Sequence, residues 1–165
     1  MTDLNSKFST QSCKIRSHTE DEVVRQVIEM LFFAYRDFNS GPDEILSDFG
    51  FGRAHHRAIY FIGRYPNQTV SNLLGILRIT KQSLSRVLRQ LVREGFVSQN
   101  PGKQDRRQRL LQLTEKGRML EERLTENQRQ RMAAALSAVD DEAVKGFCDV
   151  LLGIMSSNED RIRFE

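Results

Sequence analysis

Residues 68–95, QTVSNLLGILRITKQSLSRVLRQLVREG, decide the predicted fold, because they contain two short amphipathic helices joined by a tight turn. Apolar residues recur three and four positions apart, which is the period of a helix with one buried side; they are Leu73, Leu74 and Leu77, then Ile79, Leu84, Val87, Leu88 and Leu91. Thr69 and Thr80 are placed to cap the two helices through their hydroxyls. Gly95 suits a left-handed position, so the second helix is expected to end just before it.

The outer side of the second helix is basic and rich in hydroxyl groups, with Lys81, Gln82, Ser83, Ser85, Arg86, Arg89 and Arg93 between the apolar positions. Such side chains can address base edges and neutralise phosphates in a major groove. A solvated helix face is the plainer explanation for one isolated helix. The charge balance favours a polyanion, because residues 78–109 hold nine Lys or Arg and two acids, a net of +7 in a chain of net +3.

Length and composition set broad limits. The chain has 165 residues and 39% apolar residues, enough for one domain with a core. No stretch of about 18 apolar residues and no secretory signal occur, so no membrane partner is expected. Cys13 and Cys148 lie too far apart in sequence to form a disulfide framework. We therefore expect a reducing, cytoplasmic location.

The pattern outside the two-helix unit predicts further elements. Residues 20–38 show a wide apolar helical stripe, which the sequence NSGPD at 39–43 is expected to break before an apolar connector at 45–51. Residues 53–64 form another helix. After Gly95 the period changes to two, and strands are predicted at 96–98 and 108–114, with a turn opening at 100–102 and a basic loop between them. Helices followed by such a hairpin indicate a winged helix-turn-helix, whose tip can reach a minor groove.

The remaining segments are expected to form helices that pair with a second copy. Thr114 opens a long helix with a polar middle, and Asp140 caps a final apolar helix. The fold class is thus mainly α with a small β-hairpin wing, a winged helix-turn-helix domain plus N- and C-terminal dimerisation helices. Its expected organisation is a flexible segment (1–19), a dimerisation helix (20–40), a DNA-binding domain (45–114), linker and dimerisation helices (115–157) and a tail (158–165).

With these segments in this order, the chain resembles the MarR family of bacterial transcription regulators. The resemblance rests on HHRAIYFIGRYPNQTVSNLL, LRITKQSLSRVLRQLVREGFV and the wing QDRRQRLLQLTEKG, and covers about residues 20–155. It implies a homodimer with the recognition helix in the major groove and the wing in the minor groove. By that resemblance Asp105 holds the wing's shape, Arg107 is its tip contact and Arg106 contacts a phosphate. The predicted DNA contacts are Thr80, Lys81, Gln82, Ser83, Ser85, Arg86, Arg89, Arg93, Lys103, Asp105, Arg106 and Arg107.

Members of this family often respond to a small phenolic or anionic ligand in a crevice between the DNA-binding and dimerisation parts. Here the candidate lining residues are Phe32, Tyr35, Arg36, His55, His56, Tyr60 and Arg64. Aromatic residues at helical spacing more often belong to a core than to a ligand site. Some relatives sense oxidants through a cysteine near the start of the first helix. Cys13 lies slightly before that place, and the basic residues Lys14 and Arg16 that follow it can lower its pKa. Cys148 is expected to belong to the core.

Other chemistry finds no support in the sequence. His55 and His56 point about 100° apart on a helix, so they are not expected to share a metal, and no cofactor motif is present. No nucleophile elbow, phosphate loop or HExxH motif occurs, so we expect no enzyme. The predicted function is a homodimeric repressor on a pseudo-palindromic operator in double-stranded DNA, with a small aromatic or anionic ligand to release it. A ligand-independent activator or architectural factor and a winged-helix protein-interaction module are the alternatives.

Overall fold

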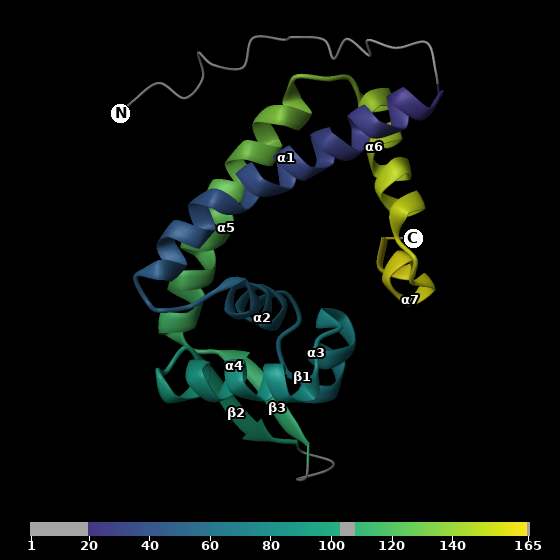
Figure 1. Ribbon diagram of the computed structural model, residues 1–165. Helices are drawn as coiled ribbons and strands as arrows, with labels where there is room; N and C mark the ends of the chain where they lie inside the picture. Colours follow the sequence, from purple (N-terminus) through teal and green to yellow (C-terminus); the bar gives the residue numbers. More distant parts are fainter. Residues whose placement is uncertain (1–19, 103–107, 165) are drawn as a thin grey trace.

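The computed structural model describes residues 20–102 and 108–164 of the chain, which form helices and one small sheet at one end of the molecule (Figure 1). Helices α1 and α5 lie side by side at one end, and α3, α4 and the sheet lie at the other. None of the described helices is long and apolar enough to cross a membrane. In chain order the elements are α1 (Glu20–Ser47), α2 (Arg53–Arg64), β1 (Gln68–Thr69), α3 (Val70–Leu77), α4 (Lys81–Arg93), β2 (Val97–Pro101), β3 (Arg109–Leu113), α5 (Glu115–Ser137), α6 (Asp141–Ile154), α7 (Asn158–Arg161) and the 3-10 helix η2 (Ile162–Phe164).

The two-helix unit forms as its sequence predicts. The Thr69 hydroxyl accepts the backbone N–H of Asn72, and the Thr80 hydroxyl accepts that of Ser83, each at 3.1 Å. The chain leaves α4 through Gly95 at φ +77°, a left-handed conformation that glycine adopts without steric cost. The apolar sides of α2, α3 and α4 then meet in one core, to which these helices contribute the buried residues Ala58, Ile59, Ile62, Leu73, Leu84 and Leu91.

The predicted hairpin is present, but it belongs to a sheet of three antiparallel strands in the order β1-β3-β2. Gln68 pairs with Leu111 on one side of β3, and Gln99 pairs with Leu111 on the other. A two-residue strand such as β1 is too short to show a period in sequence. The turn expected at 100–102 begins later, since Pro101 still pairs with Arg109. Proline is tolerated there because β2 is an edge strand.

The expected break of the first helix at residues 39–43 is wrong, because α1 continues through Pro42 to Ser47. Proline lacks the N–H that would bond to the carbonyl four residues earlier. The Gln128 amide of α5 donates instead to that carbonyl, on Phe38, at 3.2 Å. Asn127 lies so close that a Cβ on Gly41 would be 2.7 Å from its Oδ1. The polar middle of α5 therefore supplies the hydrogen bond that Pro42 cannot make, and α1 continues beyond this proline.

The C-terminal part also departs from expectation. Asp140 caps α6 as predicted, accepting the Ala143 N–H at 2.8 Å, but the expected tail contains α7 and η2. No residue of α6 is buried, and the prediction that Cys148 is a core residue is wrong, since its side chain is exposed. The reason is that no other described segment covers the apolar side of α6.

The start of α5 is joined tightly to the end of α4. The Thr114 hydroxyl donates to the Gly95 carbonyl at 2.6 Å, and the Lys116 ammonium donates to the Glu94 carbonyl at 2.9 Å. Lys116 also lies 4.1 Å from the centre of the Phe96 ring. At Gly117 an added Cβ would fall 2.0 Å from the Phe96 carbonyl oxygen, so this junction requires glycine for close approach.

Replacing Gly117 with alanine is therefore expected to lower the free energy of unfolding by about 1–3 kcal/mol or more, because the backbone of Phe96 must move. Gly75→Ala is the matched control. Gly75 is exposed inside α3 with nothing near its missing Cβ, and alanine there should add about 0.5–1 kcal/mol. Urea denaturation measures both. Equal stability of Gly117→Ala and the unsubstituted protein would contradict the close approach.

Candidate nucleic-acid interface

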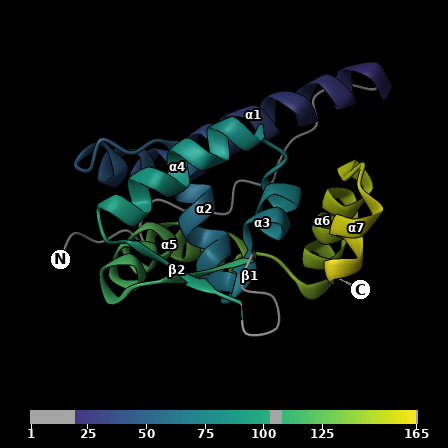
Figure 2. The ribbon, with the colours of Figure 1, turned by 90° about the horizontal axis from the view of Figure 1, so that it is seen from below.

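Helix α4 separates its side chains sharply between the core and solvent. Leu84, Val87, Leu88 and Leu91 are buried. The polar residues predicted to face DNA are all exposed: Lys81, Gln82, Ser83, Ser85, Arg86, Arg89 and Arg93. Seen from below, α4 crosses the near side of the molecule (Figure 2), so this polar side is open to a large partner.

Several of these side chains make hydrogen bonds or ion pairs within the protein. The Thr80 hydroxyl caps α4 and donates to the Ser83 hydroxyl at 2.9 Å, so the structure places Thr80 as a capping residue. Arg93 pairs with Glu94 at 3.1 Å, an exposed contact of little energy. Within residues 20–102 and 108–164, Lys81, Arg86 and Arg89 have no acidic partner within 4 Å. Their charges are free to meet a polyanion.

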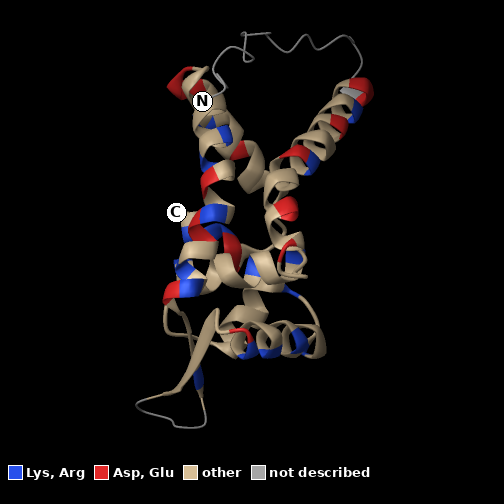
Figure 3. Cartoon of the chain, turned by 90° about the vertical axis from the view of Figure 1, so that its left-hand side faces the viewer, with Lys and Arg blue, Asp and Glu red and all other residues tan. Residues whose placement is uncertain are grey.

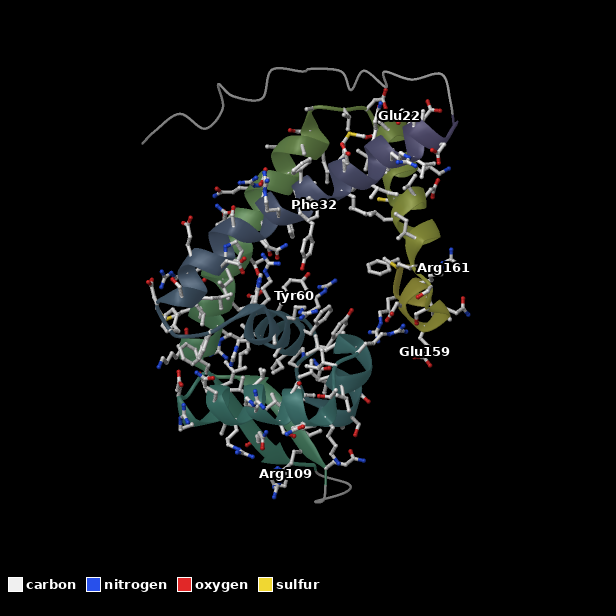
Figure 4. All side chains as sticks on the ribbon, in the orientation of Figure 1. Glu22, Phe32, Tyr60, Arg109, Glu159 and Arg161 are labelled. Atoms are coloured by element: carbon white, nitrogen blue, oxygen red, sulfur yellow. The ribbon has the colours of Figure 1, made fainter. Side chains whose placement is uncertain are left out.

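The hairpin lies at the same end of the molecule as the basic side of α4 (Figure 3). The predicted wing residues Lys103, Asp105, Arg106 and Arg107 lie outside the described residues. Arg109 at the start of β3 is exposed and lies at this lower end (Figure 4). Arg109 belongs to the basic block of residues 78–109 but is not among the predicted DNA contacts.

His55 was predicted to line a ligand crevice, but the structure uses it to join α2 to α4. Its Nδ1 accepts the Gly52 N–H at 3.1 Å, which leaves Nε2 as the protonated nitrogen facing the Gln90 Oε1 at 3.0 Å. The imidazole also stacks on the Phe51 ring with centroids 4.7 Å apart. His55 thus links α2 to α4 through Gln90.

A cavity of about 670 Å³ lies between α1, α2 and α5. Of the predicted ligand residues, Tyr35, His56 and Tyr60 line it, whereas Phe32, Arg36, His55 and Arg64 do not. The other lining residues are Phe38, Asn39, Arg57, Phe61, Thr125, Gln128, Arg129, Met132, Ala133 and Leu136. Most of the lining residues that were not predicted come from α5. The polar middle of α5 was the sequence feature that could have indicated them.

The cavity wall is mainly apolar and carries two guanidinium groups. Arg129 pairs with Glu126 at 2.8 Å, while Arg57 has no ion pair in the described part of the chain. Burial lowers the pKa of His56, an effect that Arg57 strengthens and the Asp43 carboxylate opposes. His56 is therefore neutral at neutral pH, and the arginines supply the positive charge beside the cavity.

Two further expectations concern redox and metal chemistry. Cys13 lies outside the described residues. Among the residues that the structure does describe, no cluster of three His, Cys, Asp or Glu side chains could hold a metal ion. The features that remain are the exposed polar side of α4, the hairpin beside it and the cavity behind them.

A helix pair capped by threonines, a basic outer helix and an adjacent hairpin define a winged helix-turn-helix DNA-binding protein. The family model of the MarR family matches residues 49–108. The chain is 53% identical over 135 residues to the HTH-type transcriptional regulator PetP of Rhodobacter capsulatus, covering 82% of this chain and 81% of PetP. The chain belongs to the MarR family of transcriptional regulators, which are DNA-binding proteins and not enzymes.

Solved structures share the fold. Streptococcus pneumoniae FabT, crystallised in complex with DNA, has a TM-score of 0.66 at 21% identity, over 79% of this chain and 94% of FabT. A mutant of S. aureus MepR bound to an oligodeoxyribonucleotide has a TM-score of 0.56 at 18% identity, over 81% of this chain and 96% of MepR. At these identities the likeness concerns the fold alone.

Proposed function

We propose that the protein is a homodimeric repressor that binds a pseudo-palindromic operator sequence-specifically. The observation that carries this proposal is the polar side of α4, which is fully exposed and whose Lys81, Arg86 and Arg89 lack acidic partners in the described chain. In this proposal Gln82, Ser85, Arg86 and Arg89 read base edges. Lys81, Arg93 and the wing residues Lys103, Arg106 and Arg107 supply affinity. Among the wing residues, Arg106 contacts a phosphate, Arg107 is the contact at the wing tip and Asp105 holds the wing.

The dimer is supported by apolar side chains that the single chain leaves uncovered. On α1, Ile28 and Phe32 are 61% and 63% exposed, and on α6, Val150 and Ile154 are 54% and 60% exposed. Apolar surfaces of this kind mark association sites. The N-terminal half of α1 and α6 lie at the same end of the molecule (Figure 1), where one isologous interface can cover both. In such a dimer the two copies of α4 contact DNA half-sites roughly 34 Å apart.

The cavity supports release by a small aromatic anion. Tyr35, Phe38 and Tyr60 offer ring faces, and Arg57 and Arg129 offer positive charge. The cavity touches α1 and α5 on one side and α2 on the other, and α2 holds α4 through His55. A ligand bound there contacts both the dimerisation helices α1 and α5 and the helix α2 that packs on α4. It can therefore change the spacing of the two copies of α4 in the dimer.

Replacing Arg86 with alanine is expected to weaken binding to the operator by about 1–3 kcal/mol, because a bidentate base contact is lost. Binding to random duplex should fall much less. Fluorescence anisotropy on an operator selected from a random pool measures both affinities. Arg131→Ala, which removes the same charge from α5, is the control. An equal loss on both duplexes would contradict the base-reading role.

Benzoate is a simple probe of the cavity, and millimolar benzoate is expected to release labelled operator. Replacing Arg57 with glutamine should raise the required concentration about tenfold or more, because a charge-assisted hydrogen bond is worth about 1.5–3 kcal/mol. Arg64→Gln is the matched control, since Arg64 lies on the same helix outside the cavity. Release that is absent, or equally impaired in both variants, would overturn this ligand site.

A further inference from the structure

The C-terminal strap, residues 157–164, returns from α6 to the helix-turn-helix (Figures 1 and 4). The Arg161 guanidinium donates to the Leu152 carbonyl at 2.9 Å, which fixes the strap to the end of α6. The Arg163 guanidinium lies 5.5 Å from the centre of the Tyr65 ring. The Asp160 carboxylate lies 3.3 Å from the guanidinium of Arg78. Asp160 therefore places a negative charge beside Arg78, a cation of the winged helix-turn-helix domain.

Arg78 occupies a special place in that domain. It is the C-cap of α3, two residues before the cap of α4, and has left-handed backbone angles of φ 48° and ψ 41°. Arginine is disfavoured there relative to glycine, which favours a role for its side chain. In helix-turn-helix complexes the first helix crosses the DNA backbone and the start of the second enters the major groove. The turn between them therefore belongs to the part of the domain that approaches the DNA backbone.

The pair between Arg78 and Asp160 is well suited to exchange. The two side chains are 55% and 34% exposed, and ion pairs in such surroundings are weak. Asp160 also has a second cation, because the Arg163 Nε lies 3.7 Å from its other oxygen. When Arg78 moves away, the Asp160 carboxylate still has Arg163 as an ion-pair partner. The exchange therefore leaves no unpaired charge on Asp160.

We propose that Arg78 binds a DNA phosphate and that Asp160 competes with the phosphate for it. The strap is then an internal competitor that lowers DNA affinity until Arg78 exchanges its carboxylate for the duplex. Glu159 adds a further negative charge on the same short helix, which disfavours the docked strap beside the DNA backbone. This inference rests on the DNA binding described above and adds a contact and a regulatory element to it.

The test is a double-mutant cycle with Arg78→Gln and Asp160→Asn in the full chain. The probe is a fluorescent duplex of mixed sequence and about 40 base pairs, long enough for two half-sites one helical turn apart. Asp160→Asn is expected to tighten binding about two- to fivefold, the factor that corresponds to an exposed ion pair. Arg78→Gln should weaken binding and reduce the salt slope by about 1. In the Arg78→Gln background, Asp160→Asn should tighten binding no more than Glu159→Gln does.

Glu159→Gln is the matched control, because it removes the same charge one residue earlier, where no ion pair occurs in the described chain. Its effect should be smaller than that of Asp160→Asn. Unchanged or weaker binding by Asp160→Asn, or equal tightening with and without Arg78, would overturn the competition. Wild-type protein that ignores the duplex at low salt would instead overturn the proposed function itself. Thermal unfolding of each variant shows that its fold is retained.

Discussion

The one-sided packing of α4 is the constraint on which the rest of the molecule depends. Four apolar side chains hold this helix on the core, led by Leu91 and Leu84 at 0% and 1% exposure. A turn of the helix about its axis would expose them and bury arginines, at a cost that no surface contact could offset. The same packing therefore holds the helix in place and presents its basic side outward. The buried side of α4 therefore stabilises the fold, and its exposed side is available to bind DNA.

Two features extend this constraint to α5 and α1. The junction of Thr114, Lys116 and Gly117 ties the end of α4 to the start of α5. The Gln128 hydrogen bond to the carbonyl that Pro42 leaves open ties α5 to α1. A force applied at α1 or α5 thus reaches the reading helix through packed, hydrogen-bonded elements. This continuity gives the cavity between α1, α2 and α5 a physical route to the DNA-binding surface.

The sequence predicted elements whose signals are local. The helical period, the capping threonines and Gly95 were enough for α2, α3 and α4 with nearly exact bounds. It failed where a distant partner decides the outcome, as when α5 supplies the donor that lets α1 continue past Pro42. It missed β1, which pairs across the sheet, and it placed Cys148 in a core although α6 remains uncovered. Periodicity shows that a face is apolar and does not show what covers it.

The same limit applies to the candidate sites. The residues of α4 could be assigned because exposure follows from the period of one helix. The cavity joins three helices, so only Tyr35, His56 and Tyr60 were anticipated, while the α5 side of the cavity was missed. His55, adjacent to His56 in sequence, points elsewhere and serves as a cap and a link to Gln90. Neighbours in sequence take separate roles once the helix fixes their directions.

Hydroxyl-radical footprinting of the purified protein on its selected operator shows directly whether two copies of α4 bind the duplex. We expect two protected segments on one face of the duplex, related by a dyad and centred about 10 base pairs apart, with two chains bound per duplex. A single protected segment bound by one chain, or no protection at low ionic strength, would contradict a paired reading head.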